Sequence, residues 1–333
     1  MRVGVVGAGS WGTALAHLMA TKGNEVTLWH REPAVAEAIN ATHRNPKYLK
    51  DIDLPASLTG TAMLHEAVED KDLVISVVPS HAVRDVIGRA AEHLGPDTIL
   101  VSASKGIENE TLLTMHGVFK EVLPKTLWSN VAFLGGPSFA REVASKLPTA
   151  VSIAAEDPEL AKRAQAAFSS PYMRAYTTSD VIGVELGGSL KNVLAIGAGI
   201  AEGLKFGHNT RAALITRGLA EMARMGMRMG ANPLTFAGLG GLGDLILTCT
   251  GALSRNRKVG LLLGQGKTMA QIREEMDQVA EGIKTAGSIE HLSRKLGIEM
   301  PISHEVYAIL YEGKDARKAV IDLMNRDLKD ETG

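Results

Sequence analysis

The stretch GAGSWGTALA at residues 7–16 decides the fold, because it places three glycines between a short apolar run and a helical pattern. The run RVGVVG leads into it, and the segment TALAHLMATKG repeats its apolar residues at helical spacing. A strand, the spacing G-x-G-x-x-G and a helix in this order are the fingerprint of a dinucleotide-binding βαβ unit. Gly7 permits the tight turn, Gly9 leaves room for a pyrophosphate, and Gly12 lets the helix pack closely on the strand. A tight turn with a purely structural role is the alternative.

The end of the second expected strand bears on which dinucleotide binds. In NAD-specific folds an acidic residue usually ends this strand and holds the ribose hydroxyls. Here the strand reads EVTLWHRE, so His30 and Arg31 occupy that place and Glu32 comes slightly late. An arginine suits the 2′-phosphate of NADP. We therefore favour NADPH as the cofactor, with NAD as the alternative; a solvated surface charge is the competing interpretation of Arg31.

Apolar runs and helical segments alternate through the first half of the chain. Segments such as SHAVRDVIGRAAEHLG and ETLLTMHGVFKEVL separate the runs, which disappear after about residue 180. This alternation predicts an α/β protein with a Rossmann-type, doubly wound parallel sheet in residues 1–180 and an all-helical domain in residues 181–333. The later expected strands are DLVISVVP (72–79), DTILVSAS (97–104), NVAFLGG (130–136), TAVSIAAED (149–157) and PYMRAYTTSD (171–180).

Composition and charge describe an ordinary globular protein. The 333 residues are enough for two domains, 45% of them are apolar, and the 36 basic and 37 acidic residues nearly cancel. This balance gives no indication of a nucleic-acid partner or of binding to a charged membrane surface. The single cysteine, Cys249, permits no disulfide within the chain and no cysteine-based metal site, and we expect it to be buried in a reducing compartment.

No pattern in the sequence predicts export, a membrane span or a metal site. The N-terminus lacks a basic leader followed by an apolar segment of signal-peptide length. The most apolar later stretch, residues 234–253, is interrupted by Asp244 and five glycines. The histidines lack the spacing of metal ligands, and no Ser/His/Asp set falls in a nucleophile-elbow context. We expect a cytoplasmic enzyme without an integral membrane segment and without a metal.

Small and polar residues follow the expected strands at the sheet edge where such folds bind their ligands. Lys105 comes directly after a buried strand, in SASKGIE, where a lysine that serves only solubility is unusual. GGPSFARE follows the next strand and presents Gly136, Ser138 and Ala140. We therefore expect Lys105 to belong to an active site.

Lys191 is the main candidate in the helical half, because ELGGSLKNVLAIGAG is apolar enough to be a buried helix. Burial lowers the pKa of an amine, which suits proton transfer. Asn192 follows it and is placed to hold the amine or the ligand. A lysine that snorkels out of a helix packed through glycines is the alternative. The helical neighbours of Lys191 are small, which leaves room for a ligand: Gly187, Gly188, Ala195 and Ala198.

The segment GLGDLILTCTGALSRNRKVG adds a buried charge and a helix start. Asp244 lies among glycines and apolar residues, so its charge needs a partner, for which Lys191 is the natural candidate. Ser254 stands at the expected start of a helix, beside Arg255 and Asn256. Arg255 can hold a phosphate through two parallel hydrogen bonds, and the helix start adds amide donors. An ordinary capped surface helix is the alternative.

Six motifs occur in one order along the whole chain: GAGSWGTALA, SASKGIE, GGPSFARE, ELGGSLKNVLAIGAG, GLGDLILTCTGALSRNRKVGLLLGQG and VAEGIKTA. In this order and register the chain resembles the bacterial NAD(P)-dependent glycerol-3-phosphate dehydrogenases. The resemblance implies reversible, NAD(P)H-dependent reduction of dihydroxyacetone phosphate to sn-glycerol 3-phosphate, which supplies the backbone of glycerophospholipids. The pair His30 and Arg31 also fits members of that family that use both cofactors. The apolar faces of the helical half are compatible with a homodimer.

The resemblance also implies a role for each matching residue. Lys191 would donate or accept the proton; our own hypothesis for the mechanism adds that Asn192 and Asp244 orient its amine. The residues that would contact the cofactor are Ser10, Trp11, Arg31, Lys105, Ala140, Arg255, Val279 and Glu281. The residues that would contact the substrate are Lys105, Gly136, Ser138, Asp244, Ser254, Arg255 and Asn256.

Two other functions stay open on the sequence. A β-hydroxyacid or 6-phosphogluconate-type dehydrogenase shares the expected architecture, but it would place different groups around the helix lysine and recognise a carboxylate. A protein that senses NADPH without turning it over would not need Lys191, Asp244 and Arg255 together.

Overall fold

The computed structural model of the protein describes residues 1–276, 280–328 and 330–331. Two compact units make up the chain. Unit 1 comprises Met1–Gly188 and Gly230–Asp244, and unit 2 comprises Ser189–Met229 and Leu245–Gly333. The long helix α7 (Val181–Gly203) therefore gives its first eight residues to unit 1 and the remainder to unit 2.

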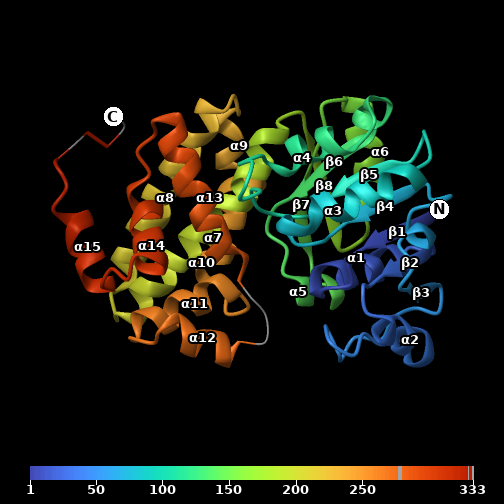
Figure 1. The fold of residues 1–333 in the computed structure, drawn as a ribbon, viewed down its shortest axis with the longest axis horizontal. Helices are drawn as coiled ribbons and strands as arrows, with labels where there is room; N and C mark the ends of the chain where they lie inside the picture. The colour runs from blue at the N-terminus through green and yellow to red at the C-terminus, as the bar shows by residue number, and fades with distance from the viewer. Residues whose placement is uncertain (277–279, 329, 332–333) are drawn as a thin grey trace. The chain divides into compact units, whose positions relative to one another are not determined.

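Unit 1 is built on a sheet of eight strands within the described residues (Figure 1). The strand order is β3-β2-β1-β4-β5-β6-β7-β8, and the first six strands in that order run parallel. This is the doubly wound order of a dinucleotide-binding fold, so the predicted fold class is confirmed. The strands are β1 (Arg2–Val6), β2 (Glu25–Trp29), β3 (Leu58–Thr61), β4 (Leu73–Ser76), β5 (Ile99–Ser102), β6 (Val131–Gly135), β7 (Thr149–Ala154) and β8 (Met173–Thr178).

The sheet differs from the predicted one in two ways. Strand β7 runs antiparallel to β6, and β8 then runs parallel to β7. The chain between β6 and β7 carries only the five-residue helix α5 (Ala140–Ala144), whereas parallel neighbours usually need a long crossover helix. The sequence pattern also does not mark the edge strand β3, because LTGT holds a single large apolar residue and a glycine.

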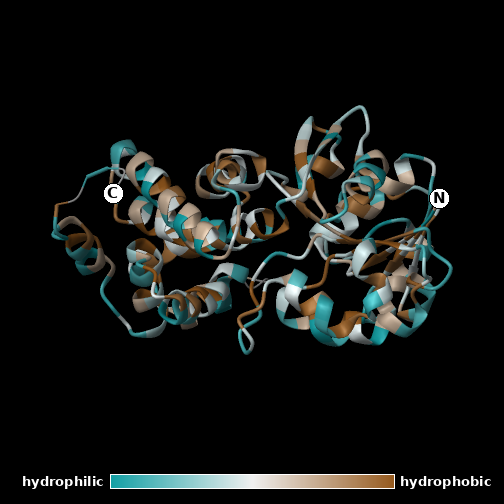
Figure 2. Cartoon of the chain, turned by 90° about the horizontal axis from the view of Figure 1, so that it is seen from above, coloured by the Kyte–Doolittle hydropathy of each residue, from teal (hydrophilic) through white to brown (hydrophobic). Residues whose placement is uncertain are grey.

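Helices cover both faces of the sheet, and the strands alternate between the two cores. Val5 and Ile75 belong to the core under α1, α2, α5 and α6, whereas Val6 and Val74 belong to the core under α3 and α4. Figure 2 shows hydrophobic strands between helices on which teal and brown residues alternate. The helices of unit 1 are α1 (Ser10–Thr21), α2 (Pro33–Thr42), α3 (Ser80–Ala90), α4 (Met115–Val122), α5, α6 (Pro158–Phe168) and α9 (Pro233–Ala237).

Helix α4 is shorter than predicted. The segment ETLLTMHGVFKEVL predicts a helix from residue 110, but α4 begins at Met115. Leu112 has a φ of 61°, in the left-handed region, and Ile107 forms an antiparallel bridge with Thr114. The chain before Met115 is therefore a turn that brings its two ends together.

The described part of unit 2 is helical, as predicted. Helices α7 and α11 approach each other closely, because a Cβ at Gly260 would overlap the carbonyl oxygen of Ile196, and one at Gly199 would overlap that of Arg257. By length and composition α7 could cross a membrane, yet 94% of its most apolar window is buried within the protein. The remaining helices are α8 (His208–Arg228), α10 (Asp244–Thr250), α11 (Arg255–Gly264), α12 (Met269–Glu275), α13 (Glu281–Leu296), α14 (Pro301–Tyr311) and α15 (Ala316–Met324).

Candidate functional site

The glycine loop between β1 and α1 has the backbone that its spacing predicts. Gly7 has a φ of 116°, which side chains rarely allow. A Cβ at Gly12 would overlap the carbonyl oxygen of Gly7, so only glycine lets α1 pack on the end of β1. Around Gly9, by contrast, no described atom lies within 4 Å of the position a Cβ would take. Gly7 and Gly12 are thus required by the fold, whereas Gly9 borders open space.

The start of α1 fits a pyrophosphate. Gly9 is the N-cap of this helix, and no described side chain caps it, so the first amides are available to an anion. The loop lies at the carboxyl end of β1, where β1 and β4 are neighbours and the strand order reverses. Ligands of doubly wound sheets bind at this point. Ser10 and Trp11 form the first turn of α1, and the indole N–H of Trp11 is buried without a hydrogen-bond partner in the described structure.

The residues that follow β2 lie beside the glycine loop, because the backbone amide of Gly7 donates to the carbonyl oxygen of Trp29 at 3.2 Å. His30 is buried, and burial is the largest cause that lowers its pKa. Its Nδ1 lies 3.1 Å from the backbone nitrogen of Glu32 and 3.4 Å from the carbonyl oxygen of the same residue. Arg31 is exposed. A buried imidazole and an exposed guanidinium therefore border this side of the glycine loop.

Lys105 and Asp244 form a buried ion pair in unit 1. The Nζ of Lys105 lies 2.9 Å from Oδ2 of Asp244, and the two side chains are 16% and 1% exposed. The same amine lies 3.4 Å from the carbonyl oxygen of Gly136, which also accepts from the hydroxyl of Ser138 at 3.0 Å. Gly136 has a φ of 109°, so a side chain is disfavoured there. The structure thus brings together the loop after β5, the loop after β6 and the start of α10.

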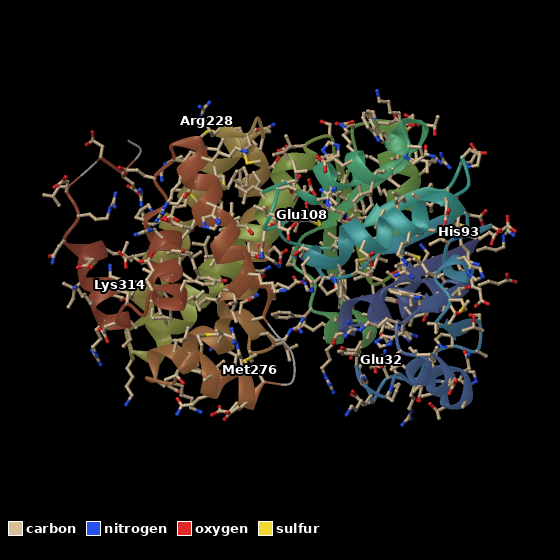
Figure 3. The ribbon with its side chains drawn as sticks, in the orientation of Figure 1. Glu32, His93, Glu108, Arg228, Met276 and Lys314 are labelled. Atoms are coloured by element: carbon tan, nitrogen blue, oxygen red, sulfur yellow. The ribbon has the colours of Figure 1, made fainter. Side chains whose placement is uncertain are left out.

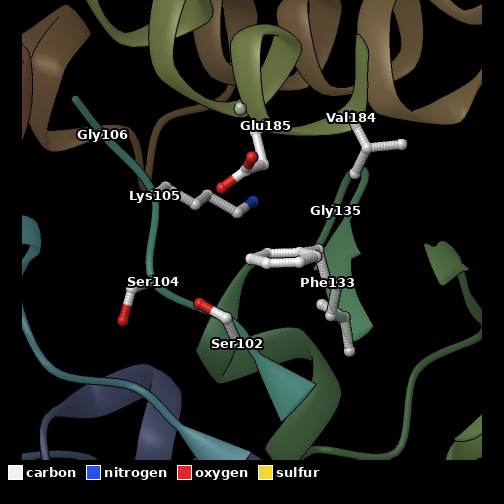
Figure 4. Close-up of a pocket in the computed structure, with 10 residues that line it drawn as sticks. Ser102, Ser104, Lys105, Gly106, Phe133, Gly135, Val184 and Glu185 are labelled. Carbon is white, nitrogen blue, oxygen red and sulfur yellow. The ribbon is translucent and has the colours of Figure 1, made fainter. Parts of the chain in front are cut away.

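Figure 4 shows the side chains of Lys105, Glu185 and Phe133 around one pocket of unit 1. Glu185 lies on α7, and its Oε1 accepts from the backbone amide of His116 at 2.9 Å. Burial raises the pKa of Glu185 to about 8. Glu185 is absent from the residues singled out in the sequence, although a lone acid in the apolar segment GVELGG is the same kind of signal as Lys191.

Two interpretations of the sequence need correction or extension here. Gly187 serves close packing inside unit 1, because a Cβ there would overlap the carbonyl oxygen of Gly240. Gly188 lines the pocket beside Lys105, and a Cβ there would lie 3.6 Å from the Lys105 side chain. Lys105 is one partner of Asp244, a pair that the sequence does not indicate. A contact between Asp244 and Lys191 stays a prediction.

In unit 2, Lys191 and Asn192 are both buried on α7, 6% and 5% exposed. Asn256 on α11 donates from Nδ2 to Oδ1 of Asn192 at 2.9 Å. The Oδ1 of Asn256 accepts from the backbone amide of Gly282 at 2.9 Å, which ties in the start of α13. A Cβ at Gly282 would lie 2.6 Å from that oxygen, so the approach requires glycine. Asn256 thus joins three helices around the residue next to Lys191.

The other predicted residues of unit 2 lie at helix starts. Ser254 is the N-cap of α11, and its Oγ accepts from the backbone amide of Arg257 at 3.2 Å, as its sequence position predicts. Arg255 is the first residue of α11 and is exposed. Glu281 is the first residue of α13. Val279 lies outside the described residues. Ala140, in unit 1, is the first residue of α5 and packs against the core beside α1.

A doubly wound sheet with an uncapped glycine loop at its reversal point, joined to a helical second unit, defines a Rossmann-type dinucleotide-binding protein. Residues 2–161 match the model of the N-terminus of NAD-dependent glycerol-3-phosphate dehydrogenase, and residues 180–321 match that of its C-terminus. The chain therefore belongs to the NAD-dependent glycerol-3-phosphate dehydrogenase family.

Relatives and solved structures agree over nearly the whole length. The chain is 55% identical over 332 residues to the glycerol-3-phosphate dehydrogenase [NAD(P)+] of Geobacter metallireducens, covering 100% of this chain and 99% of that one. It is 51% identical over 331 residues to the protein of the same name from Leptospira biflexa, covering 99% of each chain. The crystal structure of glycerol-3-phosphate dehydrogenase from Coxiella burnetii superposes with a TM-score of 0.92 at 39% identity, covering 98% of this chain and 99% of that one.

Proposed function

We propose that the protein catalyses the reversible, NAD(P)H-dependent reduction of dihydroxyacetone phosphate to sn-glycerol 3-phosphate, the backbone of glycerophospholipids. The observation that carries this function is the buried Lys105–Asp244 pair, which gathers Gly136 and Ser138 in a chain of this family. Residues 1–180 form the dinucleotide-binding domain in this proposal, and residues 181–333 form the domain for substrate binding and catalysis.

The bound dinucleotide supplies a hydride from its reduced nicotinamide, or accepts one in the reverse direction. The amides at the start of α1, with Gly7, Gly9 and Gly12, receive the pyrophosphate, and His30 and Arg31 receive the adenosine ribose. NADPH is the favoured cofactor, because Arg31 suits a 2′-phosphate. The further cofactor contacts in the proposal are Ser10, Trp11, Lys105, Ala140, Arg255, Val279 and Glu281.

Lys191 is the proposed proton donor to the substrate oxygen in reduction, and the acceptor in oxidation. The side chain of Lys191 is 6% exposed on α7. Asn192 and Asp244 orient the amine, and Lys105 adds positive charge where negative charge develops. The phosphate is received by Arg255 and Asn256 at the start of α11, with Ser254 fixing that start. Gly136 and Ser138 complete the proposed substrate contacts.

Loss of NADPH absorbance on addition of dihydroxyacetone phosphate tests the function. We expect turnover with this substrate, and none with a β-keto acid or a phosphorylated sugar acid at the same concentration. Turnover with the acids alone would favour the β-hydroxyacid or 6-phosphogluconate type. Binding of NADPH without turnover of any of them would favour the sensing protein.

We also propose that the enzyme is a cytoplasmic homodimer. The large apolar side chains of Met227, Ile321 and Met324 are exposed in unit 2, which supports a partner surface. The lone buried cysteine suits a reducing compartment. Light scattering tests the assembly: a mass near twice 35.4 kDa supports it, and a mass near 35.4 kDa contradicts it.

A further inference from the structure

A second loop contacts residues 30–32, which follow β2 beside the glycine loop; we call the region of residues 30–32 the corner. This loop, residues 43–54, is held by Asn45, whose side chain is fully buried. The Nδ2 of Asn45 donates to the carbonyl oxygen of Ala8 at 3.0 Å and to Oγ1 of Thr13 at 2.8 Å. The glycine loop and the start of α1 therefore fix the position of this second loop.

The other end of the Asn45 amide fixes the residues that follow it. Its Oδ1 accepts from the backbone amides of Lys47 and Tyr48, both at 3.0 Å. One buried side chain thus uses both of its donor hydrogens on the glycine loop and helix α1, and its oxygen on the loop that follows. The position of Lys47 is set from the protein interior, even though its own side chain is half exposed.

Lys47 points to the acid that follows β2. Its Nζ lies 2.5 Å from Oε2 of Glu32, and this hydrogen bond is the largest cause that lowers the pKa of the Glu32 carboxyl. Figure 3 labels Glu32 near the start of α2, at the surface of unit 1. Three other charged groups of the second loop form ion pairs away from Glu32, Arg44 with Asp53 at 2.6 Å and Asp51 with Arg141 at 2.5 Å, whereas Lys50 is exposed and pairs with no described residue. Of the cations in the second loop, Lys47 is therefore the one that pairs with Glu32, the residue next to Arg31.

We propose that Lys47 determines which dinucleotide the protein prefers, by holding the Glu32 carboxylate and by adding a second cation beside Arg31. A free carboxylate after β2 accepts hydrogen bonds from the ribose hydroxyls of NADH and repels a 2′-phosphate. With Glu32 engaged by Lys47, the corner carries Arg31, Lys47 and Glu32, which sum to one positive charge. This charge attracts a 2′-phosphate. The assignment rests on the proposed dinucleotide site, and Asn45 is the residue that positions Lys47.

The test compares NADPH and NADH in wild type, Lys47→Met and Lys47→Met/Glu32→Gln. Dissociation constants are measured by quenching of protein fluorescence, and kcat/KM is measured with dihydroxyacetone phosphate. We expect Lys47→Met to lower the preference for NADPH over NADH about tenfold or more, the effect of one charge-assisted hydrogen bond. The double variant also removes the carboxylate that Lys47→Met sets free. It should recover at least about a third of the lost preference, measured as the logarithm of the ratio between NADPH and NADH.

Lys50→Met is the matched control, because Lys50 is exposed in the same loop and forms no ion pair with any described residue. An unchanged preference in Lys47→Met would overturn the proposal, as would an equal loss in Lys50→Met or a double variant that recovers nothing. The binding measurement separates this proposal from the proposed reaction. A shift of the dissociation constants without turnover of dihydroxyacetone phosphate would support the role of Lys47 while contradicting the reaction.

Discussion

The Nζ of Lys105 and Oδ2 of Asp244 lie 2.9 Å apart in the interior of unit 1, where the loop after β5 meets the start of α10. We expect Asp244→Asn to lower the free energy of unfolding by about 3–5 kcal/mol, because the Lys105 cation is left buried without its counter-charge. Urea denaturation measures this change. In Lys105→Met/Asp244→Leu most of the stability should return while turnover stays lost. A loss below about 1 kcal/mol in the single variant would show that the pair is not buried as described.

Gly9 and Gly12 give opposite expectations for the same substitution. At Gly12 the added Cβ overlaps the carbonyl oxygen of Gly7, so Gly12→Ala should destabilise unit 1 by more than about 2 kcal/mol and weaken NADPH binding. At Gly9 the Cβ enters open space, so Gly9→Ala should change the stability by less than about 0.5 kcal/mol. Gly9→Ala should nevertheless raise the dissociation constant of NADPH about tenfold, because the methyl group occupies the pyrophosphate site. Equal effects of the two variants on stability would contradict the assignment.

The titration of the Glu185 carboxyl should make the stability of the protein depend on pH. Burial raises its pKa from an ordinary 4.5 to about 8, so the folded protein keeps a proton that the unfolded chain releases. The stability that protonated Glu185 contributes is complete below about pH 4.5 and is lost as the pH rises through about 8. Over this range the free energy of unfolding falls by at most about 1.4 kcal/mol per pH unit. Glu185→Gln, which keeps the acceptor for the His116 amide, should remove this part of the slope. The measurement is urea denaturation at a series of pH values, and a slope identical to that of wild type would contradict the prediction.

Arg255 should act on the substrate rather than on folding. It is the first residue of α11 and its side chain is exposed. We expect Arg255→Ala to raise KM for dihydroxyacetone phosphate roughly ten- to a hundredfold, the effect of losing charge-assisted hydrogen bonds to a phosphate. Arg255→Lys should recover little of this, because the planar fork is lost. The exposed neighbour Lys258 serves as the control, and an equal rise of KM in Lys258→Ala would show a general charge effect.

Local patterns in the sequence predict the parts of this protein that depend on neighbouring residues. The glycines of residues 7–12, the strand runs and the N-cap Ser254 each have a local cause, and the structure confirms these elements. The reversal of β7 depends on how the chain crosses after β6, which no local pattern shows. Buried charges could be recognised singly, as at Lys191 and Asp244, but the pairing of Asp244 with Lys105 could not.

The remaining site features join segments that are distant in the chain. Asp244 pairs with Lys105, which lies 139 residues away, and composition gives no preference for that partner over another lysine. Asn45 reaches the glycine loop across 37 residues from a stretch that has no periodic pattern. Such contacts follow from the sheet order and from which loops share its carboxyl edge. These contacts can therefore be identified from the three-dimensional fold but not from the sequence motifs.

The most direct test of the reaction is the turnover of Lys191→Met with NADPH and dihydroxyacetone phosphate, measured together with NADPH binding. Methionine keeps most of the volume of this buried side chain and removes its proton. We expect kcat to fall about a hundred- to ten-thousandfold, the usual worth of a positioned proton donor, while the dissociation constant of NADPH changes by less than about twofold. Turnover within about threefold of wild type, with cofactor binding intact, would contradict the role of Lys191 and with it the proposed mechanism.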